Sequence, residues 1–230
     1  ETVAAEHGLA VVEDAAPSIG STYFGRKTGS LGDIAAFSFQ GAKIMVTGEG
    51  GMVVTDNEEL IQRARFFGDH CRSSSKPLWC VGIGHKYKMS NIQAALGLAQ
   101  LERIEELIAR KRRVFGWYRE RLGDIPGLRL SAERPGVRNI YQLMGLVLED
   151  DFALTRDELI TALRRRNVDS RPFFWPLSHL PMFETADNPV VKRAALLAAL
   201  RHAHEMRPRF TVLDLARHDA HQPGQVEHGE

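Results

Sequence analysis

The chain has 230 residues and a formal net charge of +1; 43% of its residues are hydrophobic and 26% are charged. This composition allows one large domain or two small ones with a sizeable core, and it gives no general affinity for nucleic acid or an anionic membrane. No apolar run reaches the roughly 18–20 residues of a membrane span. The two cysteines have no zinc-site spacing and favour a reducing compartment, so we expect a cytoplasmic protein.

The first half of the chain alternates strand candidates with turns. Apolar and β-branched runs predict strands at residues 9–12, 34–39 and 51–55, the first of them buried. Asp56, with Glu59 three residues later, predicts a capping box and a helix through about Phe67. The sequence begins without a methionine, on residues that predict the end of a helix running into a strand. We therefore expect that an N-terminal portion is missing.

A long helix is predicted in the middle of the chain. Ser90 and Gln93 predict a second capping box, opening a helix to about Leu122. At helical spacing its apolar residues share one face: Ile104, Leu107, Ile108, Phe115, Tyr118 and Leu122. The charged residues between them then form a solvated face.

The pattern changes after this helix. Residues 141–148 predict a strand, and Thr155 with Glu158 predicts a third capping box and a helix to about Arg166. The order of elements is typical of an α/β protein with a smaller second unit. Asp124, Pro126 and Gly127 mark the boundary between the two, so we expect the first part to end at about residue 124.

Three polar residues lie at or near the ends of predicted strands. Asp14 ends the first strand, where ligands of open α/β sheets bind, although a loop hydrogen bond would also explain it. Lys43 lies among small and apolar residues. There a neutral amine can form a Schiff base, or an ordinary lysine can pack its stem on the sheet. Ser38 can hydrogen-bond a phosphate, but an isolated serine is weak evidence.

Other motifs favour less specific interpretations. The TGEGG turn at 47–51 matches neither the P-loop nor GxGxxG and is typical of a tight turn into a strand. His202 and His204 would point in different directions on a helix, so we expect no metal site. The long helix mixes charges of both signs, which argues against a nucleic-acid-binding stripe.

Five motifs occur in the order of one known family: VVEDAA, GRKTGSLGDIAAFSFQGAK, TGEGGMVVT, HKYKMSNIQAALGLAQLE and RPFFWPL. Over about residues 1–193 the chain resembles the DegT/DnrJ/EryC1/StrS family of pyridoxal-phosphate-dependent sugar-nucleotide aminotransferases, which includes perosamine synthases. The resemblance implies an α/β fold of the aspartate-aminotransferase type (fold type I). Residues 1–124 would form the C-terminal portion of the cofactor-binding large domain, and 125–193 the small α+β C-terminal domain.

The resemblance also implies a role for each of the three strand-end residues. Lys43 matches the lysine that binds the cofactor covalently and shuttles the proton between substrate and cofactor. Asp14 matches the carboxylate that pairs with the pyridine nitrogen and keeps the ring protonated, so that the ring acts as an electron sink. Ser38 matches a ligand of the cofactor phosphate.

Further contacts are implied more weakly. The segment 84–91 matches one that reaches the phosphate of the neighbouring subunit, so we expect a homodimer with shared active sites. Lys86 replaces an asparagine common in relatives, and a lysine also binds phosphate as a point charge. Arg171 and His179 lie where relatives contact the sugar nucleotide.

The implied reaction is a ping-pong transamination. An amino acid, expected to be glutamate, gives its amine to pyridoxal 5'-phosphate, which delivers it to a keto-deoxysugar carried on a nucleoside diphosphate. Two alternatives stay open. One is an inactive or regulatory cofactor-binding relative; the other is a sugar-nucleotide dehydratase of the same family, although such relatives carry histidine in place of Lys43.

The sequence departs from the family pattern in three places. Pro17 stands where relatives place a side chain that hydrogen-bonds near the cofactor ring. The N-terminal part of the large domain, with further cofactor contacts, is missing, so we expect the chain alone to be inactive. The match fades after about residue 193, so the comparison with the family implies a divergent tail at 194–230 that need not be ordered; an altered reading frame would also explain this sequence.

Overall fold

The computed structural model describes residues 2–175, 180–181 and 209–213. The chain divides into two compact units: unit 1 has residues 1–113 and 133–142, and unit 2 has residues 114–132 and 143–230. The predicted boundaries after residues 124 and 193 stay predictions. No helix in the described ranges combines the length and the apolar character that crossing a membrane requires.

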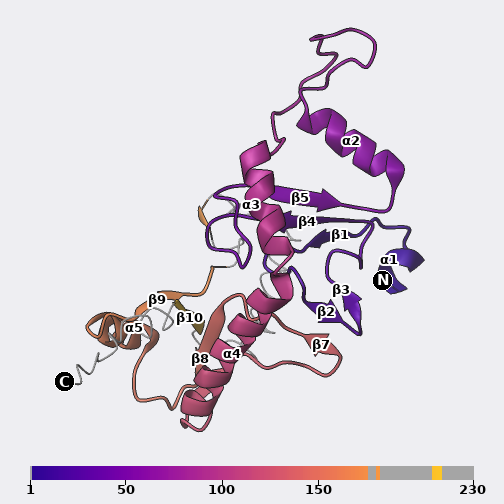
Figure 1. Ribbon diagram of the computed structural model, residues 1–230. Helices are drawn as coiled ribbons and strands as arrows, with labels where there is room; N and C mark the ends of the chain where they lie inside the picture. Colours follow the sequence, from indigo (N-terminus) through magenta and orange to yellow (C-terminus); the bar gives the residue numbers. More distant parts are fainter. Residues whose placement is uncertain (1, 176–179, 182–208, 214–230) are drawn as a thin grey trace, which may run out of the picture. The chain divides into compact units, whose positions relative to one another are not determined.

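Unit 1 contains a three-stranded sheet in the order β1-β4-β5 (Figure 1). β1 (Val12–Asp14) runs parallel to β4 (Ile34–Ser38), and β4 runs antiparallel to β5 (Gly51–Val54). The second and third predicted strands are thereby confirmed to within one residue at each end. A short second sheet has the order β3 (Arg26–Lys27), β2 (Thr22–Tyr23), β7 (Val137–Arg138).

The prediction for the first strand was wrong in position and burial. β1 starts at Val12, and Val12 is 74% exposed. The preceding Val11 amide donates to Asp33 Oδ2 at 2.7 Å, so that residue is held beside the start of β4. The apolar run thus enters the sheet only at its end.

The helices of unit 1 are α1 (Thr2–Glu6), α2 (Glu58–Gly68), α3 (Asn91–Leu101) and the first part of α4 (Ile104–Leu122). The cap of α2 is Asn57 rather than the predicted Asp56: Asn57 Oδ1 accepts from the Leu60 amide at 3.1 Å. Thr55 explains the shift, since its hydroxyl accepts from the Asn57 amide while donating to the Asp33 carbonyl. This tertiary hydrogen bond places Asn57 at the start of the helix.

The single long helix predicted from Ser90 is two helices. The Ser90–Gln93 capping box is confirmed, but α3 ends at Leu101 and α4 begins at Ile104. On α4 the predicted apolar face is confirmed at Ile108 in unit 1 and at Phe115 and Tyr118 in unit 2, all three buried. The break contains no glycine or proline, so the pattern gave no signal for it.

Unit 2 contains a four-stranded antiparallel sheet in the order β6-β8-β10-β9. Its elements are β6 (Leu128–Leu130), β8 (Met144–Leu148), α5 (Arg156–Arg164), β9 (Asp169–Pro172) and β10 (Arg209–Leu213). Alternate residues of β8 are buried, which is the period expected of a strand with one covered face. The Thr155–Glu158 capping box of α5 is confirmed.

One returning segment, 133–142, belongs to unit 1 and is tied to α4. Arg112 Nη1 donates to Glu133 Oε1 at 2.6 Å and to the Asn139 carbonyl at 2.5 Å, and Nη2 donates to Glu133 Oε2 at 3.1 Å. Glu133 Oε1 also accepts from the Asn139 amide at 2.7 Å. These charge-assisted bonds fix the segment to the helix.

This pair is expected to make stability depend on pH. The hydrogen bond from Arg112 lowers the pKa of the Glu133 carboxyl below its usual 4.5. Because the pKa is lower in the folded state, the pair stabilises the protein at pH values above the unfolded-state pKa. This stabilisation is lost as the pH falls through the folded-state pKa. We expect Glu133→Gln to cost about 0.5–1 kcal/mol at neutral pH. In denaturant titrations this difference should shrink below pH 4.5, and a difference that stays constant would contradict the prediction.

Candidate functional site

The carboxyl ends of β1 and β4 lie at one edge of the unit 1 sheet. The parallel register pairs Asp14 with Ala36, and Ser38 ends β4 two residues later. Lys43 follows in the loop that joins β4 to β5. The sheet therefore carries a carboxylate, a hydroxyl and an amine at or just beyond the same edge, where open α/β sheets bind ligands.

Asp14 is exposed and keeps one carboxylate oxygen available. Its Oδ1 accepts from the Ala16 amide at 3.0 Å, the loop hydrogen bond that was the alternative explanation for this residue. The adjacent Ala15 is buried, and its amide donates to the Ala36 carbonyl at 3.0 Å, which extends the pairing with β4. Asp14 Oδ2 makes no hydrogen bond with the described residues.

Lys43 is half-buried in a tight turn. Its amide donates to the Gln40 carbonyl at 2.9 Å, and Gln40 Oε1 accepts from the Ala42 amide at 2.9 Å. The side chain of Lys43 makes no hydrogen bond or ion pair with any residue in the described ranges. Among the described residues, Ser38 Oγ accepts one hydrogen bond, from the Gln40 amide at 3.4 Å, close to the limit of a hydrogen bond.

The TGEGG turn closes the loop that carries Lys43. The Phe39 amide donates to the Gly50 carbonyl and the Thr47 amide donates to the Phe39 carbonyl, both at 2.9 Å. Gly50 has φ +140, a conformation that side-chain-bearing residues rarely adopt. The predicted tight turn into β5 is therefore confirmed.

Two side-chain amides that the sequence analysis missed also hold this loop. Gln100 on α3 donates from Nε2 to the Val46 carbonyl at 2.7 Å and accepts the Val46 amide on Oε1 at 3.0 Å. Gln142 donates from Nε2 to the Ala42 carbonyl at 2.6 Å. These contacts join residues 54 and 100 positions apart, and no local pattern marks them.

Glu13, beside Asp14, has a structural role that the sequence analysis also missed. Its carboxylate accepts from the backbone amides of Gly29, Leu31 at 3.0 Å and Gly32 at 3.4 Å. These donors belong to the loop that leads into β4. Glu13 thereby connects β1 to that loop, whereas Asp14, the next residue, lies at the end of the strand with the other candidate site residues.

The other predicted site residues lie elsewhere. Lys86 is exposed, its backbone bridges to Asp69 beyond α2, and it makes no hydrogen bond or ion pair with Asp14, Ser38 or Lys43. Arg171 is exposed on β9 of unit 2, with Asp169 Oδ2 3.6 Å from its Nη2. His179 lies outside the described residues. The roles predicted for these three stay predictions.

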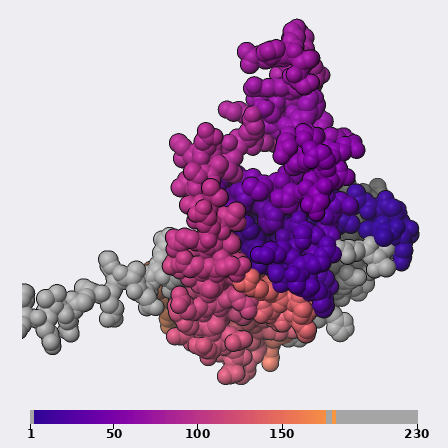
Figure 2. Space-filling view, turned by 45° about the vertical axis from the view of Figure 1, so that its right-hand side comes forward, coloured from indigo at the N-terminus to yellow at the C-terminus, as the bar shows by residue number. Residues whose placement is uncertain are grey.

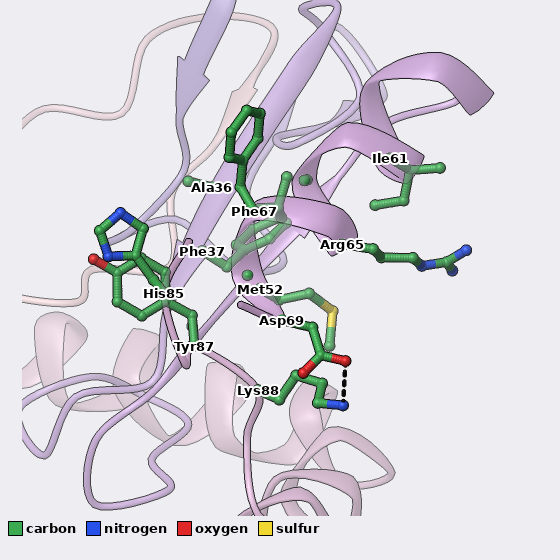
Figure 3. A pocket seen from close by; sticks show the side chains of 14 residues that line it. Ala36, Phe37, Met52, Ile61, Arg65, Phe67, Asp69, His85, Tyr87 and Lys88 are labelled. Carbon is green, nitrogen blue, oxygen red and sulfur yellow. Dashed lines mark hydrogen bonds and ion pairs between the residues drawn. The ribbon is translucent and has the colours of Figure 1, made fainter. Parts of the chain in front are cut away.

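A separate open cavity of about 830 Å³ lies between β4, β5, α2 and the residues His85, Tyr87 and Lys88 (Figure 3). The rings of His85 and Tyr87 stack with centroids 4.6 Å apart. Lys88 Nζ lies 2.8 Å from Asp69 Oδ2, and this hydrogen bond lowers the pKa of the Asp69 carboxyl. Asp14, Ser38 and Lys43 do not line this cavity.

The segment that follows α2 projects at the top of the view in Figures 1 and 2. It carries large apolar side chains in contact with solvent: Leu78 is 87% exposed and Ile83 is 92% exposed. Buried Cys71 holds its base, with the Sγ donating to the Ile83 carbonyl at 3.3 Å.

Comparison with known proteins identifies the family. The model of the DegT/DnrJ/EryC1/StrS aminotransferase family matches residues 1–213. The chain belongs to this family. It is 40% identical to the GDP-perosamine synthase of Caulobacter vibrioides over 183 residues, covering 79% of this chain and 49% of that protein. It is 38% identical to the GDP-perosamine synthase of Vibrio cholerae over 179 residues, covering 78% and 48%.

A solved aminotransferase structure shares the fold. The aminotransferase TlmJ from Streptoalloteichus hindustanus superposes with a TM-score of 0.76 at 26% identity, covering 92% of this chain and 54% of that one. The predicted α/β fold of the aspartate-aminotransferase type, present in part, is confirmed. Aminotransferases of this family depend on pyridoxal phosphate. The chain spans about half the length of the curated relatives that it matches.

Proposed function

We propose that the protein carrying this chain transfers an amino group from an amino acid to the keto group of a nucleotide-linked deoxysugar, with pyridoxal 5'-phosphate as cofactor. The observation that carries the proposal is that the Lys43 side chain makes no polar contact with the described residues. The loop that carries Lys43 is held by Gln142 and follows β4, whose end bears Ser38 and whose partner strand ends at Asp14.

The polar groups at this edge fit the cofactor. A carboxylate suits a protonated pyridine nitrogen, and Asp14 Oδ2 is without a partner in the described part of the chain. The Ser38 hydroxyl suits a phosphate oxygen, and the Lys43 amine suits an aldehyde carbon. When bound, pyridoxal phosphate supplies an electron sink for the substrate carbon.

The chain's own residues would orient the cofactor and transfer protons. Asp14 would supply the negative charge that pairs with the pyridine nitrogen and keeps it protonated. The Lys43 amine would take a proton from the substrate carbon and deliver it to the cofactor carbon. The Ala16 amide holds the Asp14 carboxylate, and the Gln40 carbonyl holds the backbone of Lys43, whose amine has no polar partner among the described residues.

The substrate and partner assignments also belong to the proposal. Relatives named GDP-perosamine synthase support a nucleotide-linked sugar, and glutamate is the proposed amine donor. The projecting segment with exposed Leu78 and Ile83 supports a homodimer in which Lys86 reaches the cofactor phosphate of the partner. Arg171 and His179 are proposed to contact the sugar nucleotide, and the protein is proposed to act in the cytoplasm.

Covalent trapping tests this function directly. Mixed with pyridoxal phosphate, the full-length protein is expected to show an absorbance band near the visible edge that disappears with borohydride. Peptide mass spectrometry should then find the reduced pyridoxyl group on Lys43. Trapping at Lys111 on α4, or spread evenly over the lysines, would contradict the proposal.

A further inference from the structure

Gln142 makes its hydrogen bond next to the proposed cofactor lysine. Its Nε2 donates to the carbonyl of Ala42 at 2.6 Å, and Ala42 is the residue before Lys43. Gln142 is only 8% exposed, so water does not readily replace this bond. We propose that Gln142 is a positioning residue for Lys43. The inference rests on the proposed function, because it assumes that Lys43 is the lysine that reacts with the cofactor.

The oxygen atom of the same amide supports this role. Gln142 Oε1 is buried and has no hydrogen-bond partner among the described residues. An unpaired buried acceptor is unfavourable, and an apolar side chain of similar shape would avoid it. The Ala42 carbonyl also fixes the amide orientation, since only the NH₂ side can donate to it. The hydrogen bond to Ala42 therefore accounts for a polar residue at this position.

Gln142 is itself held in a fixed place. Its neighbour Tyr141 has φ +50, an uncommon conformation for a residue with a side chain. The Tyr141 amide donates to Asn139 Oδ1 at 2.8 Å. Arg112 donates from Nη1 to the Asn139 carbonyl, and its Cζ lies 5.5 Å from the centroid of the Tyr141 ring. These contacts connect Gln142 rigidly to α4, so the bond to Ala42 anchors the lysine loop to the helix.

The loop offers a matched control at a second anchor. Gln100 makes the same kind of amide-to-carbonyl bond, but to Val46, three residues beyond Lys43. If both glutamines only stabilised the loop, removing either donor would have similar consequences. If Gln142 positions the lysine, its loss should affect the reactivity of Lys43 more than the loss of Gln100 at equal cost in stability.

The test compares Gln142→Glu with Gln100→Glu in the full-length protein. Each change keeps the side-chain shape, and the ionised carboxylate has no hydrogen to donate. The apo protein is mixed with pyridoxal phosphate and cyanoborohydride, and peptide mass spectrometry follows the rate of labelling at Lys43 relative to Lys111. We expect Gln142→Glu to slow the relative labelling of Lys43 by about 10- to 100-fold, because small misplacements have large effects on reaction rates. Gln100→Glu should slow it by less than about threefold.

Melting temperatures of both variants show whether they are equally folded. If Gln142→Glu does not fold, Gln142→Met, which also lacks a donor but carries no charge, should show the same selective slowing. Equal slowing in the two glutamine positions would overturn the inference. So would normal labelling of Lys43 in the Gln142 variants. A wild-type protein that is not labelled at Lys43 would instead refute the proposed function, so the two failures are distinguishable.

Discussion

Replacing Lys43 by alanine is expected to lower the kcat/KM of amino transfer by at least about 10³-fold, since both the covalent attachment of the cofactor and the proton transfer are lost. The half-buried Lys43 side chain has no polar partner in the described structure, so little stability should be lost with it. The measurement is the rate at which a nucleotide-linked keto-deoxysugar gains an amino group from glutamate, followed by mass spectrometry.

Lys111→Ala on α4 is the matched control and should keep the activity of the wild type. The absorbance band that borohydride removes should be absent in Lys43→Ala and present in Lys111→Ala. Equal activity in the two variants would show that Lys43 is not the reacting lysine. If the wild type consumed the sugar nucleotide without incorporating nitrogen, the dehydratase alternative would replace the transaminase.

The sequence predicted the elements whose signals are local. The capping boxes at Ser90 and Thr155 and the apolar face of α4 each depend on residues three or four positions apart, and the structure shows them. Asp14 and Ser38 lie at one sheet edge because parallel pairing aligns the carboxyl ends of β1 and β4. A pattern of strands with polar residues at their ends therefore indicated this edge.

The missed features depend on tertiary contacts. Asn57 rather than Asp56 caps α2 because Thr55 is bonded to both Asp33 and Asn57, and either residue type caps a helix well. Gln100 and Gln142 hold the lysine loop across long separations in sequence. Such contacts leave no periodicity, so composition and spacing give no means to find them.

Glu13 and Asp14 are adjacent carboxylates with separable effects. Glu13→Gln is expected to cost about 2–4 kcal/mol of folding stability, because a neutral amide weakens the charge-assisted bonds to Gly29, Leu31 and Gly32 and turns one acceptor into a donor facing an N–H group. Denaturant unfolding measures this loss.

Asp14→Asn is the matched control, one position along the same strand. It keeps an oxygen that can accept from the Ala16 amide, so stability should change by less than about 0.5 kcal/mol. It removes the charge opposite the pyridine nitrogen, so kcat/KM should fall by about 10²–10³-fold. If Asp14→Asn proved as destabilising as Glu13→Gln while keeping its activity, the two assignments would have to be exchanged. The distinction follows from their hydrogen bonds: the Glu13 oxygens are occupied by backbone amides, whereas one oxygen of Asp14 has no partner among the described residues.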